Sequence, residues 1–494
     1  MAGVGFELKK IFKSDSGILN VVKGYSITAA VTEGPMFLTI IMLFVLRYML
    51  KEFHASYREQ EIFLFMITYV MIFSLIIANV MLMFMDRFIS DCIYRKKIDE
   101  ILPAFYSCIF ILLIVGGGIA YVWLMTIPMS WSFKLAALLQ FSGMLICWVQ
   151  VSFLSVIKQY GYVLLGFLAG CAVAIGSSYL LMKLGGDLLL SAMWGAALGF
   201  LVMLILFMIQ ILAYYPMGKF RLFILLPAFD RHKILLITGF FMGLGVYVHN
   251  FVVWFSEFRN HVFPTGVYCT KYDIPTFFAT LTITPLLVQF VVSVETAFSK
   301  RNRRYFDTIL YGGRLEDIKS AKKDMLKIVY RELAHMLEIQ LIFTIIAATL
   351  LGNVLASLGL DSEMIGIYRV LCFGYCFYGM LKSLIIILLY FDDQAGACIS
   401  SVIFVVLSII FTIATLVWGI ETWGSGFLAA AAITTVIAFI RLRIYLRRLE
   451  YQVFCGQKLF LQEEKGIFET MEEKLELAEQ EFKKRSRKSA EKEI

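Results

Sequence analysis

Long apolar runs separated by short polar segments dominate the pattern along the chain. Twelve windows hold about 20 or more mostly apolar residues, the length that a helix needs to cross a hydrocarbon core of roughly 30 Å. Strict alternation of apolar and polar positions, which marks the strands of a membrane barrel, is absent from these windows. The pattern therefore predicts an all-α integral membrane protein with twelve transmembrane helices. The expected spans are Val22–Met49, Ile62–Met85, Leu102–Met125, Leu135–Ile157, Tyr162–Met182, Ala192–Tyr214, Ile234–Phe255, Ile274–Phe298, Leu337–Leu358, Ile365–Phe391, Ala397–Trp418 and Phe427–Tyr445.

The composition supports this class. Hydrophobic residues make up 60% of the 494 residues, charged residues only 17%, and the mean hydropathy is +0.80. Soluble domains are about half apolar and about a quarter charged. A soluble globular protein is therefore excluded.

Basic residues in the connections set the predicted orientation, because Lys and Arg mark the cytoplasmic side. They gather in the N-terminal arm and in the second, sixth and eighth loops, for example Arg95, Arg221 and Arg304, whereas the alternate loops hold few. Both termini are therefore expected to be cytoplasmic. The tenth loop departs from the pattern with Asp392 and Asp393. Topology accounts for the net charge of +8, and nucleic-acid binding is excluded because no basic patch is interleaved with exposed aromatic residues.

Two groups of six spans flank a cytoplasmic linker whose apolar middle is too short to cross a membrane, so the prediction is two six-helix lobes. A parallel duplication would give this arrangement, although the similarity between the halves is too weak to demonstrate one. The expected segments are a cytoplasmic amphipathic N-terminal arm (1–21), an N-terminal lobe (22–218), a cytoplasmic linker (219–233), a C-terminal lobe (234–450) containing a cytoplasmic helical loop (299–332), and a charged cytoplasmic tail (451–494).

The first predicted span carries Glu33, Gly34 and Pro35 in succession. Proline lacks an amide donor and clashes with the carbonyl four residues before it, so the helix is expected to kink or unwind there. Irregular backbone at membrane depth is tolerated only where protein or water covers it. The motif therefore predicts a bend that lines an internal cavity. The alternative is a neutral, structural Glu33 that forms a hydrogen bond with a neighbouring helix.

Other polar groups within spans complete the candidate lining of a translocation cavity, because such groups are costly in lipid and usually face a cavity or a partner. Pro275 and Pro285 are expected to bend the eighth span. Glu295, Arg369 and Lys382 lie near enough to span ends to reach the membrane surface instead. The candidates are Glu33, Gly34, Pro35, Asn79, His249, Asn250, Pro285, Gln289, Glu295, Arg369 and Lys382.

The basic loop between the eighth and ninth spans carries one apolar stripe at helical spacing. An apolar contact with a charged rim suits a soluble partner, so this loop is a candidate docking surface. A solvated connector is the alternative. The candidate residues are Ile309, Leu315, Ile318 and Met325, rimmed by Lys319, Lys322 and Lys323.

The sequence lacks the motifs of enzymatic chemistry. It contains no phosphate-cradling GxxxxGK[ST] motif, no zinc-ligand spacing and no cytoplasmic segment large enough for a glycosyltransferase domain. The nine cysteines include no C-x-x-C pair and fit small packing residues. Asp392 and Asp393 could bind a metal, although a solvated pair is the simpler interpretation. We therefore expect neither an enzyme nor a cofactor or metal site.

Four short motifs carry a resemblance to a known family. They are MAGVGFELKKIF (1–12), YDIPTFFA (272–279), VETAF (294–298) and YFDTILYGGRLEDI (305–318). With these motifs, its length and its hydropathy, the chain resembles the Pel exopolysaccharide exporter family, PelG. That family is similar to the polysaccharide-transporter branch of the multidrug, oligosaccharidyl-lipid and polysaccharide flippase superfamily.

The resemblance implies twelve helices in two lobes and export of an N-acetylgalactosamine-rich polymer across the cytoplasmic membrane for the biofilm matrix. It also implies membrane lipid, a cytoplasmic glycosyltransferase and other Pel membrane components as partners. The chain departs from the family pattern at Glu33, where a small polar residue is expected, and at His249 and Asn250, where an Asp-Lys pair is expected. Ion coupling is therefore not carried over. A lipid-linked oligosaccharide flippase, an ion-driven exporter of the same fold and a membrane scaffold for the glycosyltransferase stay open as alternatives.

Overall fold

The computed structural model describes residues 34–157, 160–216, 218, 221–293, 298–357 and 360–455, together with 466, 468 and 470. Within these ranges the chain is helical apart from loops and one short β-hairpin. Ten helices there are long and apolar enough to cross a membrane, or eleven when one bent pair counts as a span. The structure therefore confirms a mostly helical, multi-pass membrane protein. The first of the twelve expected spans is described only from Gly34 onward.

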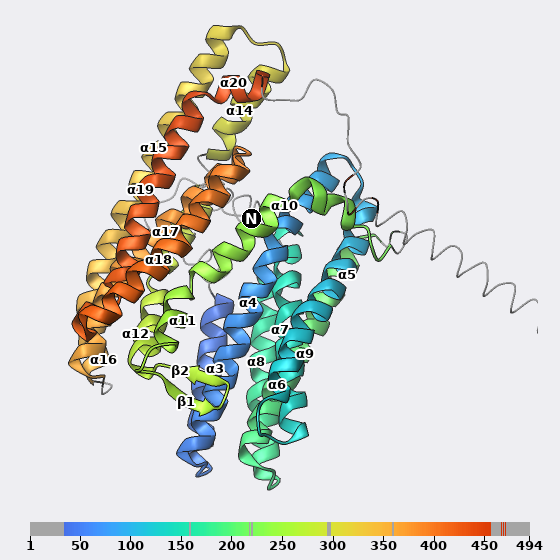
Figure 1. Cartoon of the computed structure of the whole chain (residues 1–494). Helices are drawn as coiled ribbons and strands as arrows, with labels where there is room; N and C mark the ends of the chain where they lie inside the picture. Colours follow the sequence, from blue (N-terminus) through green and yellow to red (C-terminus); the bar gives the residue numbers. More distant parts are fainter. Residues whose placement is uncertain are drawn as a thin grey trace, which may run out of the picture.

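The N-terminal half forms the bundle drawn in blue and teal in Figure 1. Its elements are α3 (Gly34–Glu52), α4 (Tyr57–Tyr94), η1 (Ile98–Glu100), α5 (Ile101–Leu112), the π-helical turn η2 (Leu113–Gly117), α6 (Gly118–Met125), α7 (Trp131–Ile157), α8 (Tyr160–Lys183) and α9 (Leu188–Tyr214). A capping box starts α4, because the Ser56 hydroxyl accepts from the Glu59 amide at 3.3 Å and the Glu59 carboxylate accepts from the Ser56 amide at 2.7 Å. Glycines bring α8 and α9 together: a Cβ on Gly199 would lie 2.5 Å from the carbonyl oxygen of Gly170.

The C-terminal half forms a second bundle beside the first (Figure 1). Its elements are α10 (Leu226–Gly245), α11 (Val248–Trp254), β1 (Asn260–Phe263), β2 (Gly266–Tyr268), α12 (Thr270–Leu281), α13 (Thr284–Ser293), α14 (Ser299–Leu310), α15 (Leu315–Ile346), the π-helical turn η4 (Ala347–Leu351), α16 (Gly352–Ser357), α17 (Ser362–Tyr390), α18 (Gln394–Trp418), η5 (Ile420–Thr422), α19 (Ser425–Arg447) and α20 (Leu449–Cys455). The expected linker 219–233 already contains the start of α10, which is kinked at His232. The expected loop 299–332 consists of α14 and the first half of α15.

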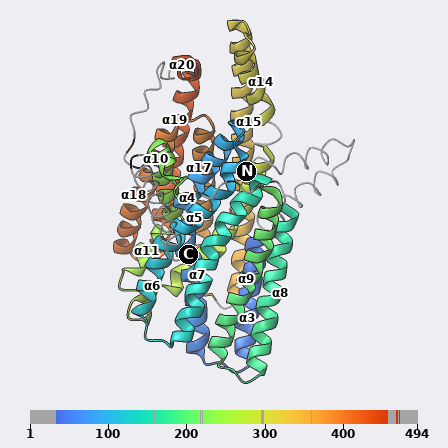
Figure 2. The same cartoon turned by 90° about the vertical axis from the view of Figure 1, so that its right-hand side faces the viewer.

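Two ends of the molecule differ in chemistry. Figure 1 shows β1 and β2 at the lower end and α14 and α20 at the upper end, and Figure 2 shows α14 and α20 standing beyond the other helices. The upper end also carries Arg95, Lys96 and Lys97 after α4. We call these the hairpin end and the basic end.

The seventh and eighth spans are each broken into two helices. α10 and α11 meet at an angle of 54°. The eighth span is interrupted before Pro285, because α12 ends at Leu281 and α13 begins at Thr284, although the two helices run on as one candidate span, Thr270–Ser293; Pro275 lies inside α12. Gln340 of α15 covers this break: its Nε2 donates to the Thr282 carbonyl at 2.8 Å and its Oε1 accepts from the Leu286 amide at 3.1 Å. A protein side chain thus satisfies backbone groups that lipid could not.

The two halves touch along α4 and α10. Glycines of α10 lie at this contact, where there is no room for a larger side chain. A Cβ on Gly239 would lie 2.1 Å from the Asn79 carbonyl oxygen, and a Cβ on Gly243 would lie 3.0 Å from the Asn79 Cβ. Small residues at such positions let two helix backbones approach closely in a membrane. Asn79, a cavity candidate, therefore lies at a helix–helix contact, where its Nδ2 donates to the Leu75 carbonyl at 2.9 Å.

The close approach predicts that Gly239→Ala destabilises the protein, because the added methyl would overlap the backbone of α4. Overpacking of this kind costs about 1–3 kcal/mol, which would lower the thermal unfolding temperature of the purified protein by several degrees. The matched control is Gly176→Ala in α8, where a Cβ would meet nothing within 4 Å. Equal unfolding temperatures for the two variants would show that α4 and α10 are not packed in this way.

Candidate functional site at the seam between the halves

An aromatic stack crosses the seam between α4 and α11 near the hairpin end. Tyr69 of α4 lies parallel to Trp254 of α11, with ring centroids 5.3 Å apart and ring planes at 5°. The same ring stacks on Trp123 of α6 at 5.3 Å and 19°. One turn further along α4, Phe73 stacks on Phe251 at 5.5 Å and 7°. Because each aromatic pair contributes about 0.5–1.5 kcal/mol beyond its buried area, the stack holds the two halves together.

The β-hairpin of the C-terminal half lies against the N-terminal half at the same end. The Tyr69 hydroxyl donates to the Val267 carbonyl at 2.5 Å and accepts from the Val267 amide at 3.1 Å. The hydroxyls of Thr126 and Thr265 share a hydrogen bond of 2.8 Å. These contacts close the hairpin end of the seam.

Asp273, in the first turn of α12, connects the aromatic stack to the rest of the C-terminal half. Its carboxylate accepts from Asn250 Nδ2 at 2.7 Å, from Trp254 Nε1 at 2.8 Å and from the Cys269 amide at 2.8 Å. The amino end of a helix also favours negative charge. Trp254 is thus fixed twice, by its ring face on α4 and by its ring N–H on α12.

Asn250 and His249 are adjacent in sequence but have different surroundings. Asn250 is 3% exposed, and its Oδ1 has no hydrogen-bond partner among the described residues, so the site holds an acceptor for a ligand donor. His249 is fully buried within the C-terminal half. Its Nε2 donates to the Val246 carbonyl at 3.1 Å, which leaves Nδ1 to accept from the Tyr272 hydroxyl at 2.8 Å. His249 is therefore a packed hydrogen-bonding group of the core.

The other cavity candidates are not gathered at Asp273. In the part of the chain that the structure describes, no hydrogen bond or ion pair connects Asn79, Gln289 or Arg369 with this carboxylate. Gln289 is buried in α13, Arg369 is exposed on α17, and Lys382 is half-buried on the same helix. Gly34 and Pro35 belong to the first turn of α3. Glu33 and Glu295 lie outside the described residues.

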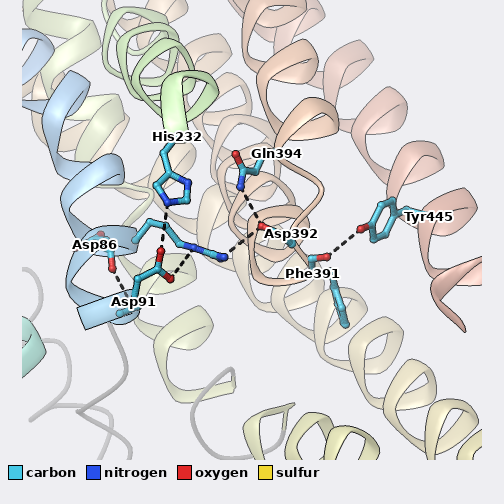
Figure 3. A network of polar contacts seen from close by, with 9 residues as sticks. Asp86, Asp91, His232, Phe391, Asp392, Gln394 and Tyr445 are labelled. Atoms are coloured by element: carbon cyan, nitrogen blue, oxygen red, sulfur yellow. Dashed lines mark hydrogen bonds and ion pairs between the residues drawn. The ribbon is translucent and has the colours of Figure 1, made fainter. Parts of the chain in front are cut away.

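At the basic end, charged side chains bridge the halves (Figure 3). Arg87 of α4 contacts Asp392, from the loop before α18, at 3.4 Å. Asp91 of α4 accepts from Arg87 at 3.2 Å and lies 3.2 Å from His232 of α10. Both side chains of the Arg87–Asp392 pair are more than a third exposed, so the pair contributes about 0–1 kcal/mol. This bridge is therefore weak enough to open.

The acidic pair of the tenth loop, which departs from the charge pattern of the other loops, has a structural explanation. Asp393 is buried and binds Arg441 of α19 through both carboxylate oxygens, at 2.8 and 2.9 Å. The Tyr445 hydroxyl donates to the Phe391 carbonyl at 3.1 Å. Asp392 adopts a left-handed backbone conformation with φ of 65° and projects toward Arg87 (Figure 3). Among the described residues, no three His, Cys, Asp or Glu side chains are grouped so that they could hold a metal ion.

Sequence reasoning missed Asp273, Trp254 and the partners of Asp392. The eighth span was expected to begin at Ile274, so Asp273 was assigned to the preceding loop. The available signal was the YDIPTFFA motif, which contains Asp273. Trp254 gave no signal, because an aromatic residue at a span end is common in membrane proteins.

Comparisons with known proteins agree with this architecture. The PelG family model, described as "Putative exopolysaccharide Exporter (EPS-E)", matches residues 1–454. No curated protein matches the sequence significantly. The MATE transporter ClbM in complex with Rb+ is 12% identical with a TM-score of 0.58, covering 87% of this chain and 96% of that chain. A MATE-family transporter of the MOP superfamily in an outward-facing conformation is 12% identical with a TM-score of 0.56, covering 86% and 96%.

A MOP-superfamily transporter from Pyrococcus furiosus is 11% identical with a TM-score of 0.55, covering 86% of this chain and 95% of that chain. At these identities the likeness shows the fold alone. The fold and the family are both those of transporters, and the family model spans most of the chain. The chain therefore belongs to the PelG family of exopolysaccharide exporters.

Proposed function

We propose that the protein exports a Pel-like, N-acetylgalactosamine-rich polysaccharide across the cytoplasmic membrane, with its basic end and both termini in the cytoplasm. The polymer would pass along the seam between the two six-helix lobes, and a cytoplasmic glycosyltransferase would deliver it at the basic end. The basic loops favour this orientation because Lys and Arg mark the cytoplasmic side.

The observation that carries the proposal is the combination of Trp254, Tyr69 and Asp273 at the seam. Sugar rings present apolar C–H faces that pack on aromatic rings, and hydroxyl and amide edges that form hydrogen bonds. In the present arrangement Tyr69 and Trp254 cover each other and are 6 and 4% exposed. Separation of the halves would uncover their ring faces beside a carboxylate and the unpartnered Oδ1 of Asn250, and the opened seam would then offer both kinds of contact. A repeating sugar could slide over such a surface, because ring faces tolerate displacement better than deep specific pockets do.

Asp273→Asn tests this site. The variant keeps the shape of the side chain but removes its charge and one acceptor oxygen, so we expect polymer export to fall about tenfold, the equivalent of 1.4 kcal/mol. Cell-surface polymer would be measured against the amount of exporter in the membrane. The matched control is Asp187→Asn, at the N-cap of α9, because Asn caps helices as well as Asp does. Normal export by Asp273→Asn at normal membrane levels would contradict the proposed path.

The helical hairpin of α14 and α15 supports the proposed partner contact. The continuous helical segment Leu315–Ala356 has 42 residues. At 1.5 Å per residue it is about 60 Å long, twice the thickness of the hydrocarbon core, so roughly half of it stands out of the membrane. The tip of this hairpin is thus too far from lipid to be a membrane anchor, and a protein partner suits it better.

Part of the expected docking stripe is already used within the chain. Ile318 and Met325 are buried, while Lys322 donates to the Arg447 carbonyl at 3.0 Å and pairs with Glu450. Partial burial opposes ionisation of Glu450, but Lys322 outweighs it and lowers the pKa of this carboxyl. Lys322 thus fastens α15 to the end of α19 and to α20, and the buried Ile318 and Met325 do not belong to the outer face of the hairpin.

The exposed remainder forms the hairpin tip: Leu310, Tyr311 and Leu315 are 76, 87 and 59% exposed. Ile309 is half-buried, and Lys319 and Lys323 are exposed on α15. Arg303 and Arg304 of α14 are also exposed beside the tip. An apolar tip within a basic rim suits a soluble partner with an apolar patch and an acidic border.

Tyr311→Ser with Leu315→Ser is expected to lower co-purification of the cytoplasmic glycosyltransferase by about tenfold, because hot-spot contacts contribute 1 kcal/mol or more each. The control is Tyr451→Ser with Phe454→Ser, two exposed aromatic residues on α20 at the same end. Undiminished co-purification by the tip variant would make the hairpin a solvated connector. Ile318→Ser is unsuitable as a test, since it would disrupt packing inside the hairpin.

A further inference from the structure

A polar cavity lies at the basic end, between α4 of the N-terminal half and α10 of the C-terminal half, away from the seam aromatics. Its volume is about 270 Å³, and the end of α4, η1 and the start of α10 form its walls. The ionisable residues that line it are the cations Arg95, Lys97, Arg221 and Arg231, the carboxylates Asp91 and Glu100, and His232.

Pairing within the chain leaves this cavity with a positive excess. Asp91 already contacts Arg87 and His232, and Glu100 pairs with Lys97 at 2.9 Å. Arg95 and Arg221 are exposed, and neither has an acidic partner among the described residues. A guanidinium group presents a planar fork of donors that matches the oxygens of a phosphate. Two such groups at one cavity therefore favour an oxyanion such as a phosphate over a neutral ligand.

The surroundings of the cavity point to a lipid rather than a dissolved ion. The cavity lies at the C-terminal end of α4, a helix long and apolar enough to cross a membrane, and the neighbouring Ile93, Tyr94 and Ile98 are 49, 89 and 45% exposed. Exposed apolar side chains next to a basic pocket can contact acyl chains while the pocket holds the headgroup. We propose that this cavity binds the phosphodiester headgroup of an anionic membrane lipid.

The position of the cavity gives the lipid a structural consequence. Its walls come from α4 of one half and α10 of the other, and two of its residues, Asp91 and His232, belong to the polar bridge at the basic end (Figure 3). A headgroup in this cavity would hold α4 and α10 in their present arrangement. Anionic lipid would thus stabilise the arrangement in which the basic end is bridged.

Lipid binding to the purified full-length protein tests the proposal. Native mass spectrometry would measure retention of phosphatidylglycerol and, separately, of phosphatidylcholine by the wild type and by Arg95→Gln with Arg221→Gln. We expect the wild type to prefer phosphatidylglycerol and the variant to bind it about tenfold more weakly, since two charge-assisted contacts are lost. The control, Arg303→Gln with Lys323→Gln, removes two exposed cations from α14 and α15 and should bind phosphatidylglycerol as the wild type does.

Three results would overturn the proposal. The first is equal retention of phosphatidylglycerol by the wild type and the Arg95/Arg221 variant. The second is a loss of phosphatidylglycerol binding in the control variant as large as in the Arg95/Arg221 variant. The third is displacement of the lipid by millimolar inorganic phosphate, which would assign the cavity to a dissolved anion. Arg95→Lys with Arg221→Lys keeps the positive charges but loses the planar donor fork of each guanidinium group, so this variant should bind phosphatidylglycerol with intermediate affinity. If the Gln variant does not fold, the comparison of the Lys variant with the wild type decides, and equal retention by the two would overturn the proposal. Export is not measured here, so a negative result leaves the proposed transport function untouched.

Discussion

The indole ring of Trp254 makes the contact on which the rest of the seam depends. Its face stacks on Tyr69 of the opposite half, and its N–H donates to Asp273 of its own half. Both contacts require α11 to leave the direction of α10, and the 54° bend between these helices provides that direction. They also require α12 to start at the membrane boundary with Asp273 in its first turn. One side chain therefore links the broken seventh span, the start of the eighth span and the long helix α4.

The two ends of the seam are closed by contacts of different strength. At the hairpin end, aromatic stacking and hydrogen bonds from Tyr69 and Thr126 hold a hairpin of one half on the other. At the basic end, the Arg87–Asp392 pair is exposed to solvent, while the loop that presents Asp392 is fixed firmly by the buried Asp393–Arg441 pair. A rigid loop with a weak terminal contact can separate from its partner without unfolding. A transporter that alternates between arrangements requires an open state within a few kcal/mol of the closed one, and the exposed Arg87–Asp392 pair opposes opening of the basic end only weakly.

Hydrophobic pattern predicted the class of the fold well, because the length and apolarity of a span are local properties. The break before Pro285 was also predictable, since proline acts on its own helix. The pairs of residues that meet in the fold but lie far apart in the sequence could not be predicted. Asp392 and Asp393 looked like a solvated pair because their partners Arg87 and Arg441 lie far away in sequence. Ile318 and Met325 looked like a docking face because the sequence does not reveal that both side chains are buried within the protein. His249 and Asn250, adjacent in sequence, occupy different environments for the same reason.

The central claim is that polymer passes between the two halves, so the halves must separate at the hairpin end during export. A disulfide across that end tests the claim most directly. Thr126→Cys with Thr265→Cys, in a chain whose exposed Cys455 is replaced by Ser, would place two sulfur atoms where hydroxyls now lie 2.8 Å apart. We predict that oxidation of the pair stops polymer export, that reduction restores it, and that each single-cysteine variant exports normally under both conditions. Undiminished export by a fully cross-linked exporter would contradict a path between the halves.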